Sequence, residues 1–267
     1  MSSETTSDQP LAQSSSTETI QTPDAIKPLG VFIGQVEEKY GLQTAIDKKP
    51  VSERIFLSET GLVGDECADN KHHGGPERAL HQYPVEHYAY WLDKYGQAVN
   101  SSTPDDSGNG DAAETTTHDW SAPGMGENIS SRGMLENNVC IGDQYQWGEA
   151  IIEVSQPRSP CFKLNRRWQV ENFSVDMQEI SRCGWLYRVI QTGYINPEDS
   201  LILIQRPDNA MTIEQVCEIF FGDPLNQQGL EQLRELKALS NSWSSKVEQR
   251  LEQGIVENWN FRLLGHA

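Results

Sequence analysis

The residue best suited to chemistry in this sequence is the cysteine at position 161, in the stretch EVSQPRSPCFKLNRR (153–167). Cys161 directly follows Pro160 and is flanked by two cations, Arg158 and Lys163. Nearby positive charge favours the thiolate, which is the form of cysteine that attacks electrophiles and binds metals. Arg158 also offers a planar fork of N–H groups that can hold a phosphate or another oxyanion. The sequence therefore predicts an activated thiol beside an oxyanion site.

A structural interpretation competes with this one, because most free cysteines are buried and act as small apolar groups. The flanking prolines and cations favour function for Cys161, whereas we accept the structural interpretation for the other four cysteines. These are Cys67, Cys140, Cys183 and Cys217. Five scattered cysteines without CxxC spacing also argue against a disulfide framework or a zinc knuckle. The Cys161 thiol remains open to three uses: covalent nucleophile, redox cysteine or soft-metal ligand.

A glycine-rich segment, GLVGDECADNKHHGGPERALHQYP (61–84), carries a second group of candidate residues. Its glycines permit backbone conformations closed to other residues and let the chain approach a ligand closely. Four potential donors surround the glycine pair at 74 and 75: Lys71, His72, His73 and Arg78. Open backbone amides with nearby cations are what an anion-binding loop requires. We therefore expect this segment to bind an anion.

A zinc site is the alternative interpretation of the same segment, because four histidines lie close together in sequence. They are His72, His73, His81 and His87. Adjacent histidines point apart on a strand, and no cysteine pair completes a tetrahedral set of ligands. The spacing therefore disfavours zinc.

A third and weaker pattern is PGMGENISSRG (123–133), in which Asn128 follows two glycines and precedes two serines. Such a loop suits the presentation of amide and hydroxyl groups to a ligand. A turn that leads into a strand explains the same residues equally well, so Asn128 is a candidate by its position alone.

These candidates lie in loops of a segment rich in short β-like runs, from Leu29 to about Pro207. The runs include GVFIGQVE, RIFLSETGLVGDE, NNVCIGDQYQWGEAIIEVSQ and SLILIQRP, separated by glycine, aspartate and proline. Helical spacing is clear only in YPVEHYAYWLDKYG (83–96), which ends at a glycine. Many short strands and few helices predict a mainly β domain, either barrel-like or a sandwich.

After Pro207 the pattern changes to three short amphipathic helices. Thr212 and Gln215 have the spacing of a capping box at the start of the first helix. Leucines at 230, 233, 236 and 239 mark the second, and Gly254 ends the third. The plain interpretation is a small packed bundle. A helix-turn-helix DNA reader is the alternative, but the acidic character of these helices disfavours it.

Two segments have little to bury, namely residues 1–27 and about 100–120. Both are rich in serine, threonine and acidic residues, so we expect a disordered tail and a disordered insertion. Segments 1–26 and 100–120 hold nine acids and no Lys or Arg, and removing them changes the net charge from −18 to −9. An acidic protein of this kind is not expected to bind duplex DNA or an anionic membrane. The predicted organisation is a tail (1–27), a β domain (28–207) and a three-helix domain (208–267).

The compartment is also predicted from composition. No apolar run approaches the length of a membrane span, and the N-terminus lacks a signal-peptide core. The cytoplasm is therefore the expected location.

The three clusters, in their chain order 61–84, 123–133 and 153–167, resemble the MOSC-domain family, named for the C-terminal domain of molybdenum cofactor sulfurase. The similarity is closer to its YiiM-type branch, the 6-N-hydroxylaminopurine resistance proteins. It rests on GLVGDECADNKHHGGPERALHQYPVEHYAYW, GENIS, NNVCIGDQYQWGEAIIEVSQPRSPCFKLN and GWLYRVIQTG, and covers about residues 29–265. The most specific motif is SQPRSPCFKL, which follows a predicted strand that begins with WGEA. The tail and the 100–120 insertion have no counterpart in the family pattern.

The resemblance implies a β-barrel that holds a molybdopterin cofactor, with Cys161 as the protein ligand to molybdenum. It implies cofactor contacts, by motif position, from Arg158, Lys163, Arg78, His73, Lys71 and Asn128. Pyridoxal phosphate binding is a further family-level expectation. The implied reaction is two-electron reduction of an N-hydroxylated compound, such as 6-hydroxylaminopurine, to an amine and water. The resemblance also implies an NADPH-dependent flavoprotein as the electron donor. No GxGxxG motif follows a strand in this sequence, so the donor is expected to be a separate protein.

Two other functions remain open at this point. Cys161 could hold a persulfide and deliver sulfur to an acceptor without molybdenum. Alternatively, the chain could be a non-catalytic binding module whose three helices contact a partner.

Overall fold

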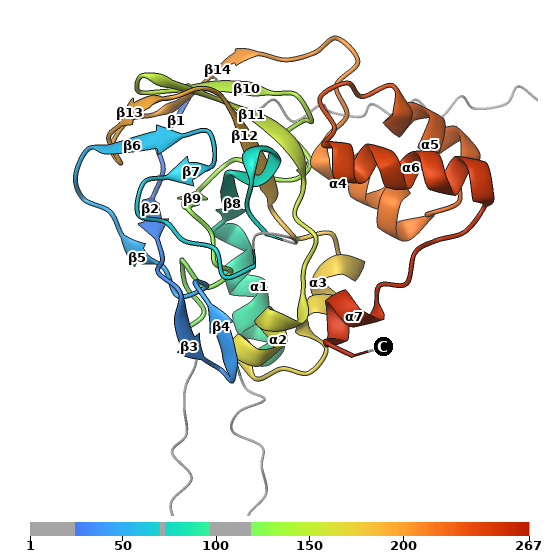
Figure 1. Ribbon diagram of the computed structural model, residues 1–267, viewed down its shortest axis with the longest axis horizontal. Coiled ribbons are helices and arrows are strands. Elements are labelled where there is room, and N and C mark those ends of the chain that lie inside the picture. Colours follow the sequence, from blue (N-terminus) through green and yellow to red (C-terminus); the bar gives the residue numbers. More distant parts are fainter. Residues whose placement is uncertain (1–24, 70–72, 97–118, 267) are drawn as a thin grey trace, which may run out of the picture.

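The computed structural model describes residues 25–69, 73–96 and 119–266, and its largest element is a nine-stranded sheet (Figure 1). Neighbouring strands pair antiparallel, except β8 and β9, which are parallel. In spatial order the strands are β1 (Ala25–Ile26), β14 (Leu201–Gln205), β10 (Gln144–Trp147), β11 (Ala150–Pro157), β12 (Trp185–Gln191), β8 (Leu80–Pro84), β9 (Ile129–Ser131), β2 (Gly30–Ile33) and β5 (Lys49–Pro50). Two smaller sheets contain β13 (Gly193–Ile195), β6 (Ile55–Ser58) and β7 (Gly61–Leu62), and β3 (Glu37–Lys39) with β4 (Leu42–Thr44).

The expected barrel is not confirmed. Within the described ranges no strand pairing closes the large sheet, whose edge strands β1 and β5 are each two residues long. Pro50 in β5 has no N–H to donate to a further strand. The observed architecture is a mixed sheet with helices, followed by a helical C-terminal part.

The longest hairpin of the large sheet follows the turn chemistry of the sequence. β10 and β11 are joined by the predicted turn at Gly148-Glu149, where Gly148 has a φ of 56°. β11 also pairs with β12, and the register shifts between Val154 and Gln156. This long strand carries the chain to Pro157, four residues before Cys161.

The helices next to the sheet are α1 (Glu86–Tyr95), α2 (Phe162–Trp168) and α3 (Phe173–Glu179), with a 3-10 turn, η1 (Pro76–Arg78). Of these helices only α1 was predicted. α2 and α3 are seven residues each, and neither has a side-chain cap, so the usual sequence signals for a helix start are missing. An aromatic cluster packs α2 and α3 against α1. In this cluster Trp120 stacks on Trp168, with ring centroids 3.9 Å apart.

Two boundaries predicted from composition are wrong by a few residues. Ala25 and Ile26, assigned to the tail, pair with β14. Trp120, assigned to the insertion, is buried and belongs to the aromatic cluster. In each case an apolar side chain at the end of a polar segment finds a packing partner. Residues 1–24 and 100–118 of these segments lie outside the described residues.

The helical C-terminal part contains α4 (Ile213–Cys217), a π-helical turn η3 (Glu218–Gly222), α5 (Gln227–Arg234), α6 (Asn241–Gln253) and α7 (Asn260–Leu264). The capping box of Thr212 and Gln215 is present, and Gly254 ends α6 with a φ of 64°. α7 was not predicted. It lies apart from α4–α6, beside α2 and α3 (Figure 1). In the described part of the chain, no helix has the length and apolarity needed to cross a membrane.

Candidate functional site

Cys161 lies where β11 ends and α2 begins. Pro157 is the last residue of β11 and pairs with Trp185, and the Arg158 N–H then donates to the Gly184 carbonyl oxygen at 3.0 Å. Proline cannot extend the strand pairing, so the chain leaves the sheet and enters α2 with Cys161 as its N-cap residue. The turn therefore places the thiol at the boundary between the sheet and the helices.

The glycine-rich segment supplies the nearest partner of the thiol. His73 Nε2 lies 3.5 Å from Cys161 Sγ, although 88 residues separate the two in sequence. Cys161 is only 6% exposed. The Arg78 guanidinium donates from Nε to the Gly74 carbonyl oxygen at 3.1 Å and so stabilises the same loop. The structure thus brings together two clusters that the sequence identified separately.

The pKa of the Cys161 thiol is lowered to about 6 from an ordinary value of 9.0. Burial opposes ionisation and is the largest single influence. It is outweighed by the hydrogen bond and charge of His73, the charge of Arg158 and the backbone N–H of Lys163. Burial instead raises the pKa of the Cys183 thiol to about 12 and that of the Cys140 thiol to about 11. Of these three cysteines, Cys161 is therefore the one that is mainly a thiolate at neutral pH.

This contrast predicts the pH dependence of alkylation. In cofactor-free protein, iodoacetamide should modify Cys161 with a midpoint near the pKa of about 6. Because the pKa is lowered, the thiolate fraction rises through pH 6 and reaches ~90% at pH 7. In His73→Ala the midpoint should move toward 9. An unchanged midpoint in that variant would show that His73 does not stabilise the thiolate.

Arg158 is the second cation beside the thiol. Among the described residues, the hydrogen bond found for its guanidinium is from Nη1 to the thioether of Met177, at 3.2 Å. A thioether is a weak acceptor, which leaves most of the guanidinium N–H groups for a ligand. His81 lies nearby, and burial together with the charge of Arg158 lowers its pKa to about 3. His81 is therefore neutral and does not compete for an anion.

The remaining predicted residues differ in what they contact. Lys163 approaches the thiolate through its backbone N–H, and its side chain is partly exposed. The Asn128 side chain is buried, and its Nδ2 donates to Phe32 O at 3.1 Å and to Asp65 Oδ2 at 2.7 Å. Its Oδ1 accepts from the His81 N–H at 3.1 Å, so both amide hydrogens and the oxygen are used within the protein. Lys71 lies outside the described residues.

The histidines that the structure describes are not grouped as zinc ligands. His87 pairs with Glu136 at 2.7 Å, His81 Nε2 lies 3.5 Å from the Cys183 carbonyl oxygen, and His73 contacts Cys161. Over ranges 25–69, 73–96 and 119–266, no three His, Cys, Asp or Glu side chains gather as a metal would require. His72 falls in the gap between these ranges.

Arg262 is a site residue that sequence reasoning missed. It comes from α7, about 100 residues after the cysteine, and its Nη1 donates to the Pro160 carbonyl oxygen. Its Nη2 donates to Gln178 Oε1 at 2.5 Å. No sequence pattern links these positions, because the contact depends on how α7 returns to α2 and α3.

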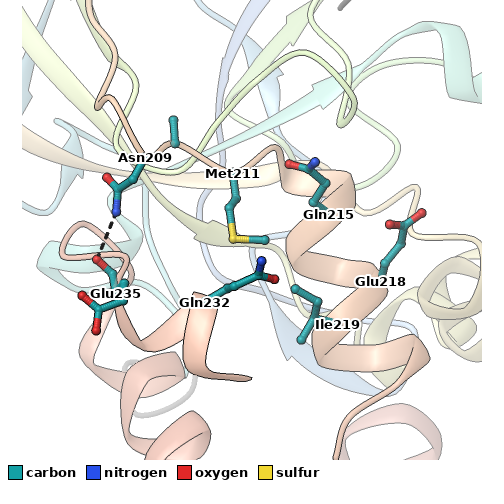
Figure 2. Close-up of a pocket in the computed structure, with 8 residues that line it drawn as sticks. Asn209, Met211, Gln215, Glu218, Ile219, Gln232 and Glu235 are labelled. Atoms are coloured by element: carbon teal, nitrogen blue, oxygen red, sulfur yellow. Dashed lines mark hydrogen bonds between the residues drawn. The ribbon is translucent and has the colours of Figure 1, made fainter. Parts of the chain in front are cut away.

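A surface groove lies elsewhere, between the segment at Asn209–Met211 and helices α4 and α5 (Figure 2). Its volume is about 540 Å³. Its lining includes Glu218 and Glu235 and contains no Lys or Arg. An anionic ligand would be repelled by such a surface. The chemistry therefore favours the region around Cys161 over this groove as the site.

Comparison with known proteins shows the family of this chain. The sequence matches the MOSC domain over residues 69–202 and the YiiM-like, 3-alpha helix domain over residues 211–254. It is 36% identical to protein YiiM of Escherichia coli over 239 residues, which are 89% of this chain and 98% of that protein. A protein of Gibberella moniliformis named "Reductase" is 39% identical over 167 residues, which are 62% of this chain but 26% of that protein.

Solved structures give the same result for the fold. The crystal structure of YiiM from Escherichia coli has a TM-score of 0.72 and 31% identity, and the match covers 91% of this chain and 100% of that one. This chain belongs to the MOSC domain family. Within that family it has the YiiM-like arrangement, in which a 3-alpha helix domain follows the MOSC domain.

The residues around Cys161 fit the molybdenum cofactor that the family name implies. A thiolate is a soft ligand for such a metal, and Arg158 has N–H groups that form no hydrogen bond within the described ranges and could bind a phosphate. His73 Nδ1 is buried and makes no hydrogen bond to any residue that the structure describes. A side chain added at Gly75, where φ is 88°, would meet nothing within 4 Å. There is consequently room beside the loop that presents His73.

Proposed function

We propose that this protein is a molybdenum-cofactor-dependent reductase of N-hydroxylated compounds, with Cys161 as the protein ligand to molybdenum. The observation that carries the proposal is the geometry at Cys161, where His73 Nε2 lies 3.5 Å from the buried Sγ. Arg158 is three residues away in sequence, and its positive charge lowers the pKa of the thiol. Family membership supports the cofactor class, and the relative named "Reductase" supports the reaction class.

The proposed reaction converts a hydroxylamine and two protons to an amine and water, with two electrons supplied from outside. A bound molybdenum cofactor would supply the two-electron exchange. The electron donor is an NADPH-dependent flavoprotein in this proposal, and base analogues such as 6-hydroxylaminopurine are the substrate class.

The residues of this chain have separate tasks in that reaction. Cys161 would hold the metal through Sγ, and His73 would fix the direction of that sulfur through Nε2. Arg158 would bind the phosphate of the pterin with the N–H groups that form no hydrogen bond to the described residues. The burial of Cys161 keeps bulk water away from the sulfur and strengthens each of these electrostatic contacts.

The test is expression with cofactor synthesis switched on or off. The loaded protein should contain molybdenum and reduce 6-hydroxylaminopurine with a chemical electron donor, whereas the cofactor-free protein should do neither. Loaded protein with full molybdenum content and no reduction of any N-hydroxylated compound would refute the reductase proposal. Protein without molybdenum but with a cyanide-labile sulfur on Cys161 would indicate a sulfur carrier instead.

Arg158→Ala should weaken cofactor retention without unfolding the protein. Loss of a charged contact to a phosphate is expected to reduce retention by about 10- to 100-fold, while the thermal midpoint changes little. Arg158→Lys should recover part of the loss, because it keeps the charge but not the two-pronged geometry. The measurement is molybdenum per protein after gel filtration. Equal retention in wild type and Arg158→Ala would exclude Arg158 from the cofactor site.

A further inference from the structure

The short C-terminal helix α7 contacts the same elements that carry Cys161. Asn165 of α2 donates from Nδ2 to the Leu263 carbonyl oxygen at 2.9 Å, and Ser174 of α3 donates from Oγ to the same oxygen at 2.6 Å. Asn165 Oδ1 accepts from the Ser174 N–H at 2.8 Å, which ties α2 to α3. The Leu263 side chain is buried. α7 is therefore held on α2 and α3 by specific polar contacts.

Arg262 extends this contact to the turn that bears the thiol. One nitrogen of its guanidinium donates to the Pro160 carbonyl oxygen, and another donates to Gln178 Oε1. The Pro160 carbonyl belongs to the peptide unit that immediately precedes Cys161. The two-pronged contact thus joins α7, the turn and α3 through one side chain.

The orientation of that peptide unit matters for the sulfur. Cys161 is the N-cap of α2, with φ −139° and ψ 163°, and its side chain makes no capping hydrogen bond. The direction of its Cα–Cβ bond is therefore set by the backbone on either side. α2 fixes the backbone after the cysteine, and Pro160 restricts only its own φ. A donor to the Pro160 oxygen fixes the plane of the peptide between them.

We propose that Arg262 is a positioning residue for Cys161, and that α7 is in this way a structural part of the site. The inference deepens the proposed function, but the geometry of the thiol can be tested without the cofactor. It also distinguishes α7 from the rest of the helical part, since the match to the YiiM-like, 3-alpha helix domain ends at residue 254.

The experiment measures labelling of each cysteine by N-ethylmaleimide in cofactor-free protein, resolved by peptide mass spectrometry. It is done at about pH 9, above the lowered pKa of Cys161, so that the rate reports access to the sulfur. Arg262→Ala should accelerate labelling of Cys161 about tenfold, because the turn loses a charged hydrogen bond. Arg262→Lys should restore much of the wild-type rate, since an ammonium can still donate to the Pro160 oxygen. Arg234→Ala, on the exposed face of α5, is the matched control and should have no effect.

Buried Cys183 and Cys217 report on unfolding in the same samples. The inference is supported if Cys161 alone accelerates and Arg262→Lys rescues it. It is overturned if Cys161 is unchanged in Arg262→Ala, or if all three cysteines accelerate together and Arg262→Lys gives no rescue. In loaded protein, Arg262→Ala should also lower molybdenum content. If the wild type acquires no molybdenum, the proposed function fails, while the labelling result still decides whether Arg262 positions the thiol.

Discussion

Replacing Cys161 with serine is expected to abolish molybdenum binding and to lower hydroxylamine reduction by at least about a hundredfold. The serine hydroxyl is close in size to the thiol, but it is a hard ligand and stays protonated at neutral pH. No cluster of His, Cys, Asp or Glu elsewhere in the described part of the chain is arranged to hold the metal instead. The measurements are molybdenum per protein by mass spectrometry and the rate with a chemical electron donor.

The matched control for this prediction is Cys67→Ser. Cys67 is a partly exposed cysteine of the glycine-rich segment, and its Sγ contacts the Asp69 carbonyl oxygen at 3.5 Å. This variant should keep both its molybdenum and its activity. Circular dichroism should show that Cys161→Ser is folded, because the substitution leaves no large cavity. A folded Cys161→Ser protein with wild-type molybdenum content would exclude Cys161 as the ligand.

Replacing Glu257 with glutamine is expected to cause the largest loss of stability among the predictions made here, about 3 kcal/mol in the free energy of unfolding. Glu257 follows α6 and accepts from Arg250 Nε at 3.1 Å and Nη2 at 3.0 Å. The Arg250 side chain is fully buried, and its Nη1 donates to the Phe220 carbonyl oxygen at 2.8 Å. Removing the carboxylate would leave a buried guanidinium without its counter-charge. Urea unfolding at pH 7 measures the difference.

The pH dependence of this contribution follows from the pKa of Glu257. Burial raises that pKa, but the nearby Trp259 indole, the backbone N–H and the charges of Arg250 and Lys246 lower it overall, below the ordinary value of 4.5. A lowered carboxyl pKa gives stability that is present above the unfolded value and is lost as the pH falls through the folded value. The wild type and Glu257→Gln should therefore converge in stability at acid pH.

Glu252→Gln, on the exposed face of α6, is the control and should stay within about 0.5 kcal/mol of wild type. A similar small loss in Glu257→Gln would contradict the account of this pair.

Local features of the fold were predictable because each depends on residues a few positions apart. Gly148 at the β10–β11 turn, the capping box of Thr212 and Gln215, and Gly254 at the end of α6 all have a local physical cause. The effect of the Arg158 charge on the pKa of the Cys161 thiol was predictable for the same reason, since the two are three residues apart. Membership of the MOSC family was also apparent from the sequence motif around Cys161.

Features that depend on distant contacts were not predictable in this way. α2 and α3 lack side-chain caps and gain their stability from packing of Trp168 and Phe173 in the aromatic cluster. Asn128 resembled a ligand contact in sequence, but its amide is used to join Phe32, Asp65 and the strand at His81. The expected barrel came from the pattern of short strands and from the resemblance, and the strand pairings do not confirm it.

Arg262 illustrates the limit most clearly. Its partner, the Pro160 carbonyl oxygen, is a backbone atom 102 positions earlier, and backbone acceptors leave no trace in side-chain patterns. Only the return of α7 to α2 and α3 brings the two together.

The most direct test of the central claim is molybdenum X-ray absorption spectroscopy of the loaded wild type and of excess cofactor mixed with Cys161→Ser, whether or not the variant retains it. If Cys161 is the ligand, the wild-type spectrum should contain one more sulfur in the metal's coordination shell than the variant spectrum. Identical sulfur coordination in the two proteins would contradict the assignment of Cys161 as the molybdenum ligand.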